Sequence, residues 1–321
     1  MKLQTEIKVK KQEHSQIDYD SKLVLLGSCF SENIGTKLSC FKFQSLSNPF
    51  GILFHPKAIE TFVFRAVREM EYTEADVFFH NERWHCYDAH SKLSAVSKDA
   101  LVIALNSNLR LLNKQIKEAT HVIITLGTAW VYNLVESNQT VANCHKVPQK
   151  HFNKKLLLVK EISSSLKKTE ALIHSVNEKV SLIFTVSPVR HIKDGFVENT
   201  LSKAHLITAI HQCVNQSPSK HGLQVFYFPA YEIMMDELRE YRFYNADMLH
   251  PNDTAIEYIR QKFQMAWMDS KTMLVSKAVS DIQKGLAHKP FNEDSVAHKR
   301  FPENIKMKQK ALQLQFPRLK F

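Results

Sequence analysis

Short apolar runs alternate with longer amphipathic segments through most of this chain. The apolar runs are bounded by turn-forming residues and predict strands at Leu23–Leu26, Phe41–Leu46, His121–Leu126, Ser181–Val186 and Val225–Phe228. Elsewhere apolar residues recur every three or four positions and predict helices at Cys29–Leu38, Pro56–Met70, Lys98–Ala119, Phe152–Lys179, Asn199–Val214 and Asp253–Ser270. This alternation favours an α/β fold, in which a parallel sheet is covered by helices on both faces.

Two segments depart from the alternation. Val77–Ser91 is rich in aromatic residues and histidine and predicts a hairpin or an irregular insertion, as does Trp130–Pro148. From Lys271 onward the pattern becomes polar and helical, and Pro290 and Pro302 are expected to break it. We therefore expect an α/β catalytic domain over residues 1–270 and a mainly helical extension over residues 271–321.

The composition is that of a globular protein whose charge is unevenly distributed. Hydrophobic residues make up 44% of the 321 residues, enough for a sizeable core. The net charge is +11, and residues 271–321 hold 11 Lys and Arg against 4 Asp and Glu. A solvated helix is the commoner explanation of such a basic tail. Nucleic-acid binding is the alternative, and it predicts affinity for a random duplex that falls steeply with salt.

Apolar residues and cysteines are distributed as in a cytoplasmic protein. No segment approaches the roughly 18 apolar residues of a membrane span, and the first residues, MKLQTEIKVKKQEHSQ, lack the apolar run of a signal peptide. The five cysteines are odd in number, widely spread and without a CxxC pair. This pattern favours free thiols over a disulfide framework.

The first predicted strand ends at Gly27-Ser28, and a helical segment follows at once. A serine in this place lies at the carboxyl end of a strand, beside a helix amino terminus whose free N–H groups favour negative charge. This is where an α/β enzyme carries a nucleophile. The alternative is structural, because serine is also a preferred N-cap residue.

Far along the chain, Asp247-Met248-Leu249-His250-Pro251 supplies what a nucleophilic serine needs. A serine hydroxyl must pass its proton to a base, and histidine is the usual base when an acceptor holds its other nitrogen. Asp247 and His250 are three residues apart and can face each other across one turn. Pro251 is expected at the first position of the next helix. Ser28, His250 and Asp247 are therefore predicted to act together.

The other candidate residues are expected to bind substrate, and we expect neither a metal nor a nucleotide cofactor. Three histidines and a cysteine crowd residues 80–90, but their spacing fits no standard zinc pattern, so we expect no metal. The sequence contains no P-loop and no GxGxxG motif, so we expect no nucleotide cofactor. His90, Arg190 and His191 are expected to line the substrate cleft, with Arg190 able to clamp a carboxylate or a phosphate. A structural role for these three side chains is the alternative.

The motif Gly27-Ser28-Cys29-Phe30-Ser31 resembles the defining motif of the GSCFA-domain family, bacterial proteins placed with the SGNH (GDSL-like) hydrolases. The likeness covers residues 23–259 and includes Asn48–Gly51, Trp84–Ser91, Leu126–Tyr132, Thr185–His191 and Tyr231–Pro251. It implies a three-layer α/β/α, flavodoxin-like fold with a parallel central sheet. It also implies a Ser-His-Asp site in which Ser28 is the nucleophile, His250 the base and Asp247 its orienting partner.

The resemblance further implies an oxyanion hole built from the serine N–H, a glycine N–H and an asparagine side chain. Gly51 is the matching glycine. The Gly-x-Asn usual in SGNH enzymes is replaced here by Gly127-Thr128-Ala129, so the expected asparagine is missing. One such donor is worth about 10²–10³ in rate. We expect Thr128 or Asn48 to substitute, because these residues lie beside Gly127 and Gly51.

Together these features predict a serine hydrolase, an esterase or deacylase that cleaves a small acyl ester such as an O-acetylated carbohydrate. The same apparatus could pass the acyl group to an alcohol, so an O-acyltransferase is an alternative. A catalytically degenerate fold that serves as a binding or scaffold protein is another, and the missing asparagine favours it. The sequence leaves the oligomeric state open.

Overall fold

A five-stranded parallel sheet forms the centre of the computed structural model, which describes residues 5–216, 224–288 and 296–321. The strands lie in the order β2-β1-β5-β9-β10. Counted along the chain, this is the order 2-1-3-4-5 of flavodoxin-like folds, as the resemblance implied. The strands are β1 (Lys22–Gly27), β2 (Gln44–Ser47), β5 (His121–Leu126), β9 (Ser181–Val186) and β10 (Gln224–Phe228).

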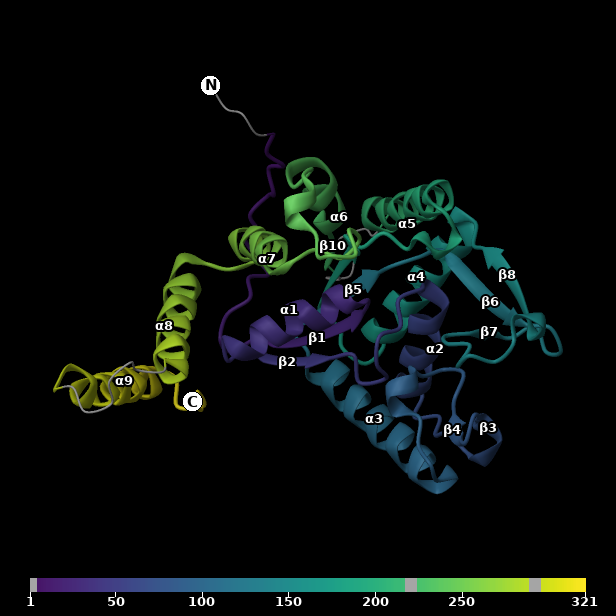
Figure 1. Ribbon diagram of the computed structural model, residues 1–321, viewed down its shortest axis with the longest axis horizontal. Coiled ribbons are helices and arrows are strands. Elements are labelled where there is room, and N and C mark those ends of the chain that lie inside the picture. The colour runs from purple at the N-terminus through teal and green to yellow at the C-terminus, as the bar shows by residue number, and fades with distance from the viewer. Residues whose placement is uncertain (1–4, 217–223, 289–295) are drawn as a thin grey trace.

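Helices cover both faces of the sheet, as the alternating pattern predicted (Figure 1). Successive side chains of a strand point to opposite faces, so Val24 and Leu26 belong to one apolar core and Leu23 and Leu25 to the other. The first core is covered by α2 (Pro56–Val67), α3 (Lys98–Glu118), α4 (Val159–His174) and α5 (Phe196–Gln216). The second is covered by α1 (Cys29–Cys40), α6 (Ala230–Glu232) and α7 (Asp253–Trp267).

Several predicted boundaries shift for local reasons. The strand expected at Phe41–Leu46 begins only at Gln44, because Phe41 closes α1 and Lys42 adopts a left-handed backbone (φ 64°). The helix expected at Phe152–Lys179 is wrong at its start, where β8 (Phe152–Leu156) pairs along its whole length with β6 (Trp130–Leu134). Pairing with a distant strand outweighs the local helical pattern at this point.

Both predicted insertions contain antiparallel structure. The first holds a hairpin of β3 (Phe78–His80) and β4 (Arg83–His85). The second contributes β6 and β7 (Thr140–Val141), which with β8 form a three-stranded sheet in the order β7-β6-β8. Short helical turns complete the chain: η1 (Glu74–Asp76), η2 (Ser91–Leu93), η3 (Gln149–His151), η4 (Ile192–Asp194), η6 (Ile233–Glu237) and η7 (Tyr241–Phe243).

Two helices, α8 (Ser270–Ala287) and α9 (Val296–Gln315), make up the C-terminal extension (Figure 1). Pro290 lies outside the described residues, whereas Pro302 lies inside α9 and does not break it. The helix continues past the proline because its apolar side packs on α8, where Ile305 lies against Gly285. In the ranges described above, no helix combines the length and the apolar character of a membrane span.

Candidate functional site

The carboxyl end of β1 brings Ser28 to the point where the strand order reverses, between β1 and β5. Gly27 makes this approach possible: its φ is +127°, and a Cβ there would lie 2.0 Å from the carbonyl oxygen of Thr125. The Ser28 N–H donates to the same oxygen (3.1 Å). In flavodoxin-like sheets this switch point is where ligands bind.

Ser28 is the N-cap of α1, because its Oγ accepts a hydrogen bond from the Phe30 N–H (3.2 Å). The side chain is fully buried, at 0% exposure. Ser28 therefore has the structural role of an N-cap residue, which is the alternative to a nucleophile that the sequence offers. This role leaves the hydroxyl proton free, since within the described part of the chain Ser28 Oγ donates to no acceptor.

Asp247 and His250 face each other as predicted. His250 Nδ1 lies 2.6 Å from one Asp247 oxygen, and the other oxygen accepts from the backbone N–H groups of Leu249 and His250, both at 2.9 Å. Met248 allows this tight turn by adopting a left-handed backbone (φ 60°). The backbone N–H of His250, then that of Leu249 and then the imidazole lower the pKa of Asp247 to about 2. The carboxylate therefore stays ionised and holds the proton on Nδ1, which leaves Nε2 as an acceptor.

The segment from Tyr241 to Asn252, which we call the base loop, folds back on itself. The Asn245 N–H donates to the His250 carbonyl (2.8 Å), and Tyr244 pairs with Pro251 in an antiparallel bridge. Pro251 is therefore not the first residue of α7, as the sequence had suggested. The helix begins at Asp253 because the Asn252 side chain caps it by accepting from Ala255 N–H (3.1 Å).

Ser28 and the base loop lie at the same edge of the sheet without being hydrogen bonded to each other in the described residues. Lys203 and His191 both lie against Gly127, just past β5: the Lys203 ammonium donates to the Gly127 carbonyl (2.8 Å), and a Cβ on Gly127 would lie 2.9 Å from His191 Nε2.

The two backbone groups predicted for the oxyanion hole already have acceptors. The Ser28 N–H donates to Thr125, and the Gly51 N–H donates to the Asn48 carbonyl (2.8 Å). Gly51 has a φ of +79°, and a Cβ there would lie 2.4 Å from His90 Cβ, so this turn requires glycine. An oxyanion would have to share or displace these two carbonyl partners.

The two side chains proposed to replace the missing asparagine differ in what they contact. Asn48 Oδ1 accepts from the Gly27 N–H (2.8 Å), and its Nδ2 lies 3.5 Å from the Ser28 carbonyl oxygen. Thr128, beside Gly127, is buried, and its hydroxyl contacts Ser202 Oγ (3.0 Å) and accepts from the Trp130 N–H (3.1 Å). The Asn48 amide is therefore the one that adjoins Ser28.

The three residues expected in the cleft occupy different surroundings. His90 caps η2 by accepting from the Lys92 N–H (3.2 Å), and it lies against Gly51. Arg190, half-buried after β9, donates from Nη1 to the Tyr244 hydroxyl (2.6 Å) and so ties the base loop to the sheet. His191 stacks on Phe54, with ring centroids 4.8 Å apart. Burial lowers the pKa of His191 to about 3, with smaller contributions from Lys203 and His250, so this ring stays neutral.

Sequence reasoning missed Lys203, which lies within the predicted helix Asn199–Val214 and belongs to no motif. It is 1% exposed, and its ammonium donates to the carbonyls of Gly127 (2.8 Å) and Ser187 (2.9 Å), just past β5 and β9. Burial lowers its pKa to about 7. A lysine on an amphipathic helix is normally solvent-exposed, so no sequence signal marks this one. The packing of α5 against the strand ends places it at the site.

The histidines and the cysteine of residues 80–90 are the remaining candidates for chemistry, as metal ligands. Across the described ranges, no group of three or more His, Cys, Asp or Glu side chains is arranged to hold a metal ion. His85 instead contacts Ser94 Oγ (2.6 Å), and His145 contacts the Cys86 carbonyl (2.7 Å). All five cysteines are free, as predicted.

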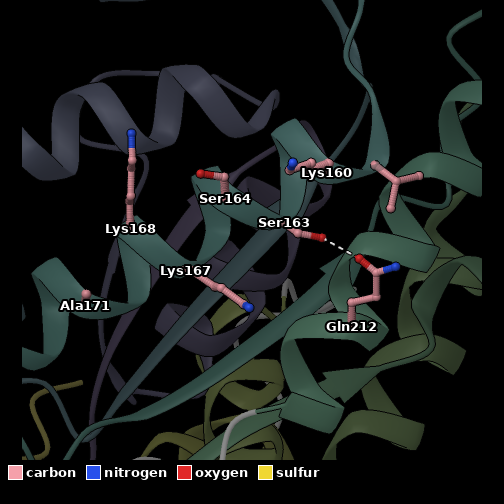
Figure 2. Close-up of a pocket in the computed structure, with 8 residues that line it drawn as sticks. Lys160, Ser163, Ser164, Lys167, Lys168, Ala171 and Gln212 are labelled. Carbon is pink, nitrogen blue, oxygen red and sulfur yellow. Dashed lines mark hydrogen bonds between the residues drawn. The ribbon is translucent and has the colours of Figure 1, made fainter.

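A groove of about 740 Å³ lies between α4 and α5 (Figure 2). Figure 2 shows Lys160, Ser164 and Lys168 on α4, and a hydrogen bond from Ser163 Oγ to Gln212 on α5 (2.9 Å). Because none of the predicted catalytic side chains lines it, this groove is separate from the candidate site.

The sheet order and the edge that carries Ser28 define a flavodoxin-like α/β protein with its candidate site at the switch point. Residues 22–263 match the model of the GSCFA family, and residues 279–321 match that of the GSCFA domain protein, C-terminal domain. The chain therefore belongs to the GSCFA family.

Three solved structures have similar chain paths. One is a carbohydrate esterase family 3 from Talaromyces cellulolyticus (TM-score 0.39, 9% identity, 81% of this chain and 99% of that chain covered). The second is a serine-to-alanine mutant of an acetyl esterase with acetate ion (TM-score 0.39, 10% identity, 82% of this chain and 99% of that chain covered). The third is an acetyl xylan esterase from the rumen bacterium Butyrivibrio proteoclasticus (TM-score 0.34, 11% identity, 84% of this chain and 65% of that chain covered). No curated protein matches the chain by sequence.

Proposed function

We propose that this protein is a serine hydrolase of the SGNH type, an esterase or deacylase that cleaves a small acyl ester such as an O-acetylated carbohydrate. The observation that carries the proposal is the Asp247–His250 pair. Its 2.6 Å contact with an ionised carboxylate leaves Nε2 ready to accept a proton, at the edge of the sheet that carries Ser28.

In the proposed reaction, Ser28 Oγ attacks the acyl carbonyl carbon while its proton passes to His250 Nε2. Asp247 stabilises the imidazolium that forms. His250 then gives the proton to the leaving alcohol, and water repeats the sequence to release the acid and free Ser28. Nε2 and Oγ are not hydrogen bonded in the described residues, and we propose that the bound substrate favours a closure of the base loop that brings them together.

Asn48 is the side chain we propose for the missing oxyanion donor. Its Oδ1 accepts from the Gly27 N–H and its Nδ2 donates to the Ser28 carbonyl, so this amide adjoins Ser28, whereas the Thr128 hydroxyl contacts Ser202. The N–H groups of Ser28 and Gly51 complete the hole once the oxyanion shares or displaces their carbonyl partners. We expect Asn48→Ala to slow turnover by about 10²-fold and Thr128→Val to have little effect. Near-normal rates in both variants would contradict a role for either side chain.

The substrate cleft is proposed to run from His90 past the site to Arg190 and His191. His90 borders the Gly51 turn, and Arg190 has guanidinium N–H groups beyond the one that contacts Tyr244. His191 is neutral and stacked, so it serves as a wall of the cleft and carries no charge.

One experiment tests the proposal directly. The purified protein is treated with a fluorophosphonate probe, and the adduct is located by mass spectrometry. We expect labelling at Ser28 that is lost in His250→Ala. If the folded protein is not labelled, it is not a serine hydrolase.

Two other functions share features of this site. An O-acyltransferase would use the same residues, and added alcohol acceptors would then yield a new ester in place of free acid. A binding or scaffold protein is favoured by the full burial of Ser28 and by the lack, in the described residues, of a hydrogen bond between Ser28 and His250. The probe distinguishes this second candidate, because a scaffold would leave Ser28 unlabelled.

A further inference from the structure

In the part of the chain that the structure describes, two cations at the carboxyl edge of the sheet have no carboxylate partner. Lys203 is 1% exposed and donates to the carbonyls of Gly127 and Ser187. Arg190 is half-buried and donates to the Tyr244 hydroxyl. Throughout the described ranges, neither cation lies within ion-pair distance of Asp or Glu.

The two cations lie on neighbouring parts of this edge, because the Lys203 ammonium donates to the Ser187 carbonyl (2.9 Å) and Arg190 follows three residues later. The Lys203 ammonium lies 5.6 Å from the centre of the Tyr231 ring, and the charge of Arg190 affects the same tyrosine. Arg190 also acts on Lys203, and this like charge adds to burial in lowering the pKa of Lys203. Like charges held together without a counterion are costly, because a buried charge is normally paired.

Both side chains keep donors for a further partner. An ammonium has three N–H groups and a guanidinium has five, whereas Lys203 makes two hydrogen bonds and Arg190 makes one in the described residues. The position is next to the proposed chemistry, since the Ser28 N–H donates to Thr125 and the Lys203 ammonium donates to Gly127, two residues further along the same strand end.

We propose that Arg190 and Lys203 form a binding site for an anionic group of the substrate, a carboxylate or a phosphate. This inference rests on the proposed hydrolase function and adds the substrate class: an acyl ester that carries an acid. Arg190 contacts the anion directly through its remaining N–H groups. Lys203 lies behind the strand ends and supplies positive potential without leaving its carbonyl partners.

Matched esters test this assignment. The mono-4-nitrophenyl ester of succinic acid and 4-nitrophenyl butyrate have acyl chains of equal length, and only the first carries a carboxylate. We expect Arg190→Gln and Lys203→Met to lower kcat/KM for the anionic ester by about 10–100-fold, and to affect the neutral ester much less. Lys193→Gln is the control, because it removes an exposed charge from the same segment and should change neither rate.

Equal losses on both esters would overturn the proposal, because the two cations would then serve the reaction or the fold and not an acid on the substrate. Lys203→Arg keeps the positive charge and should keep the preference for the anionic ester. If Lys203→Met does not fold, the comparison of Arg190→Gln with Lys193→Gln decides alone.

A second measurement does not depend on hydrolysis. Inorganic phosphate at constant ionic strength should raise the Tm of the wild-type protein and of Lys193→Gln, and it should raise the Tm of Arg190→Gln less. An equal shift in all three, or none, overturns the anion site even if Ser28 is labelled by the probe. A selective shift without labelling keeps the anion site and rejects the hydrolase.

Discussion

Among single residues, Asp247 and Lys203 are the charged groups nearest the proposed reaction, and their surroundings act on their charges in different ways. Asp247 is exposed, yet three hydrogen bonds hold it ionised and fix the His250 tautomer. Lys203 is buried, and desolvation lowers its pKa to about 7. Asp247 can stabilise a positive charge on the imidazole, whereas Lys203 contacts no carboxylate in the described residues.

The charge of Asp247 is predicted to matter for rate and not for stability. We expect Asp247→Asn to lower kcat by about 10³–10⁴-fold, because the amide no longer stabilises the imidazolium or the correct tautomer. The Tm should change little, because the asparagine amide oxygen can still accept from the backbone N–H groups of Leu249 and His250. Steady-state kinetics and thermal melts measure both quantities. Asp253→Asn, at an exposed acid nearby, is the control, and equal kinetics in the two variants would contradict the role of Asp247.

Lys203 is predicted to make stability depend on pH. Its folded pKa of about 7 lies below the unfolded value of about 10.4, so between these pH values the unfolded state binds more protons. The free energy of unfolding should therefore rise with pH over this window, by at most about 1.4 kcal/mol per pH unit. Urea unfolding at pH 7, 8 and 9 should show this rise relative to Lys203→Met. Parallel curves for the two proteins would refute it.

Among the structural elements, the base loop is the part whose position decides catalysis. It is held together by its own backbone hydrogen bonds and, in the described residues, takes one hydrogen bond from the sheet side, from Arg190 to Tyr244. Its backbone at Met248 is left-handed. Phe243 and Tyr244 also pack against the second apolar core, so apolar contacts hold the loop as well as this hydrogen bond.

Tyr244→Phe is predicted to loosen this loop. It removes the hydroxyl that accepts from Arg190, a bond worth roughly 1 kcal/mol, so labelling of Ser28 by the fluorophosphonate should slow about fivefold. Hydrogen exchange should quicken in residues 241–252. Tyr241→Phe is the matched control, because this tyrosine is 74% exposed. If both variants exchange and react alike, the anchor is not the Tyr244 hydroxyl.

In the molecule as a whole, the C-terminal extension shares a core with the α/β unit. Buried residues of α8 and α9 belong to the same apolar cluster as Phe263 and Trp267 of α7. The N-terminal segment contributes as well, since the Ile17 N–H donates to the Trp267 carbonyl (2.6 Å) and the Tyr19 and Phe316 rings lie 5.6 Å apart. Ends distant in the sequence therefore stabilise each other.

Ile282→Ala is predicted to destabilise the whole protein. The side chain is 1% exposed, and truncation of such a residue costs about 2–5 kcal/mol. Because the core is shared, denaturant unfolding should remain one transition shifted to lower concentration. Leu286→Ala, at a position 51% exposed on the same helix, should have little effect. A separate early transition would show that the extension unfolds independently.

Local sequence was enough to predict the parallel sheet, most helices and the Ser28 and Asp247–His250 motifs. Hydrophobic periodicity is local and follows from which side of an element is buried, and the Asp247–His250 contact spans only three residues. His121–Leu126 and Ser181–Val186 formed strands with the predicted bounds for this reason.

Long-range packing set the remaining features. Phe152–Leu156 became a strand because β6 pairs with it, and Pro302 stayed within a helix packed on α8. Lys203 joined the site because α5 packs its ammonium onto carbonyls that follow β5 and β9. These features depend on contacts between residues far apart in the chain, which no local pattern encodes.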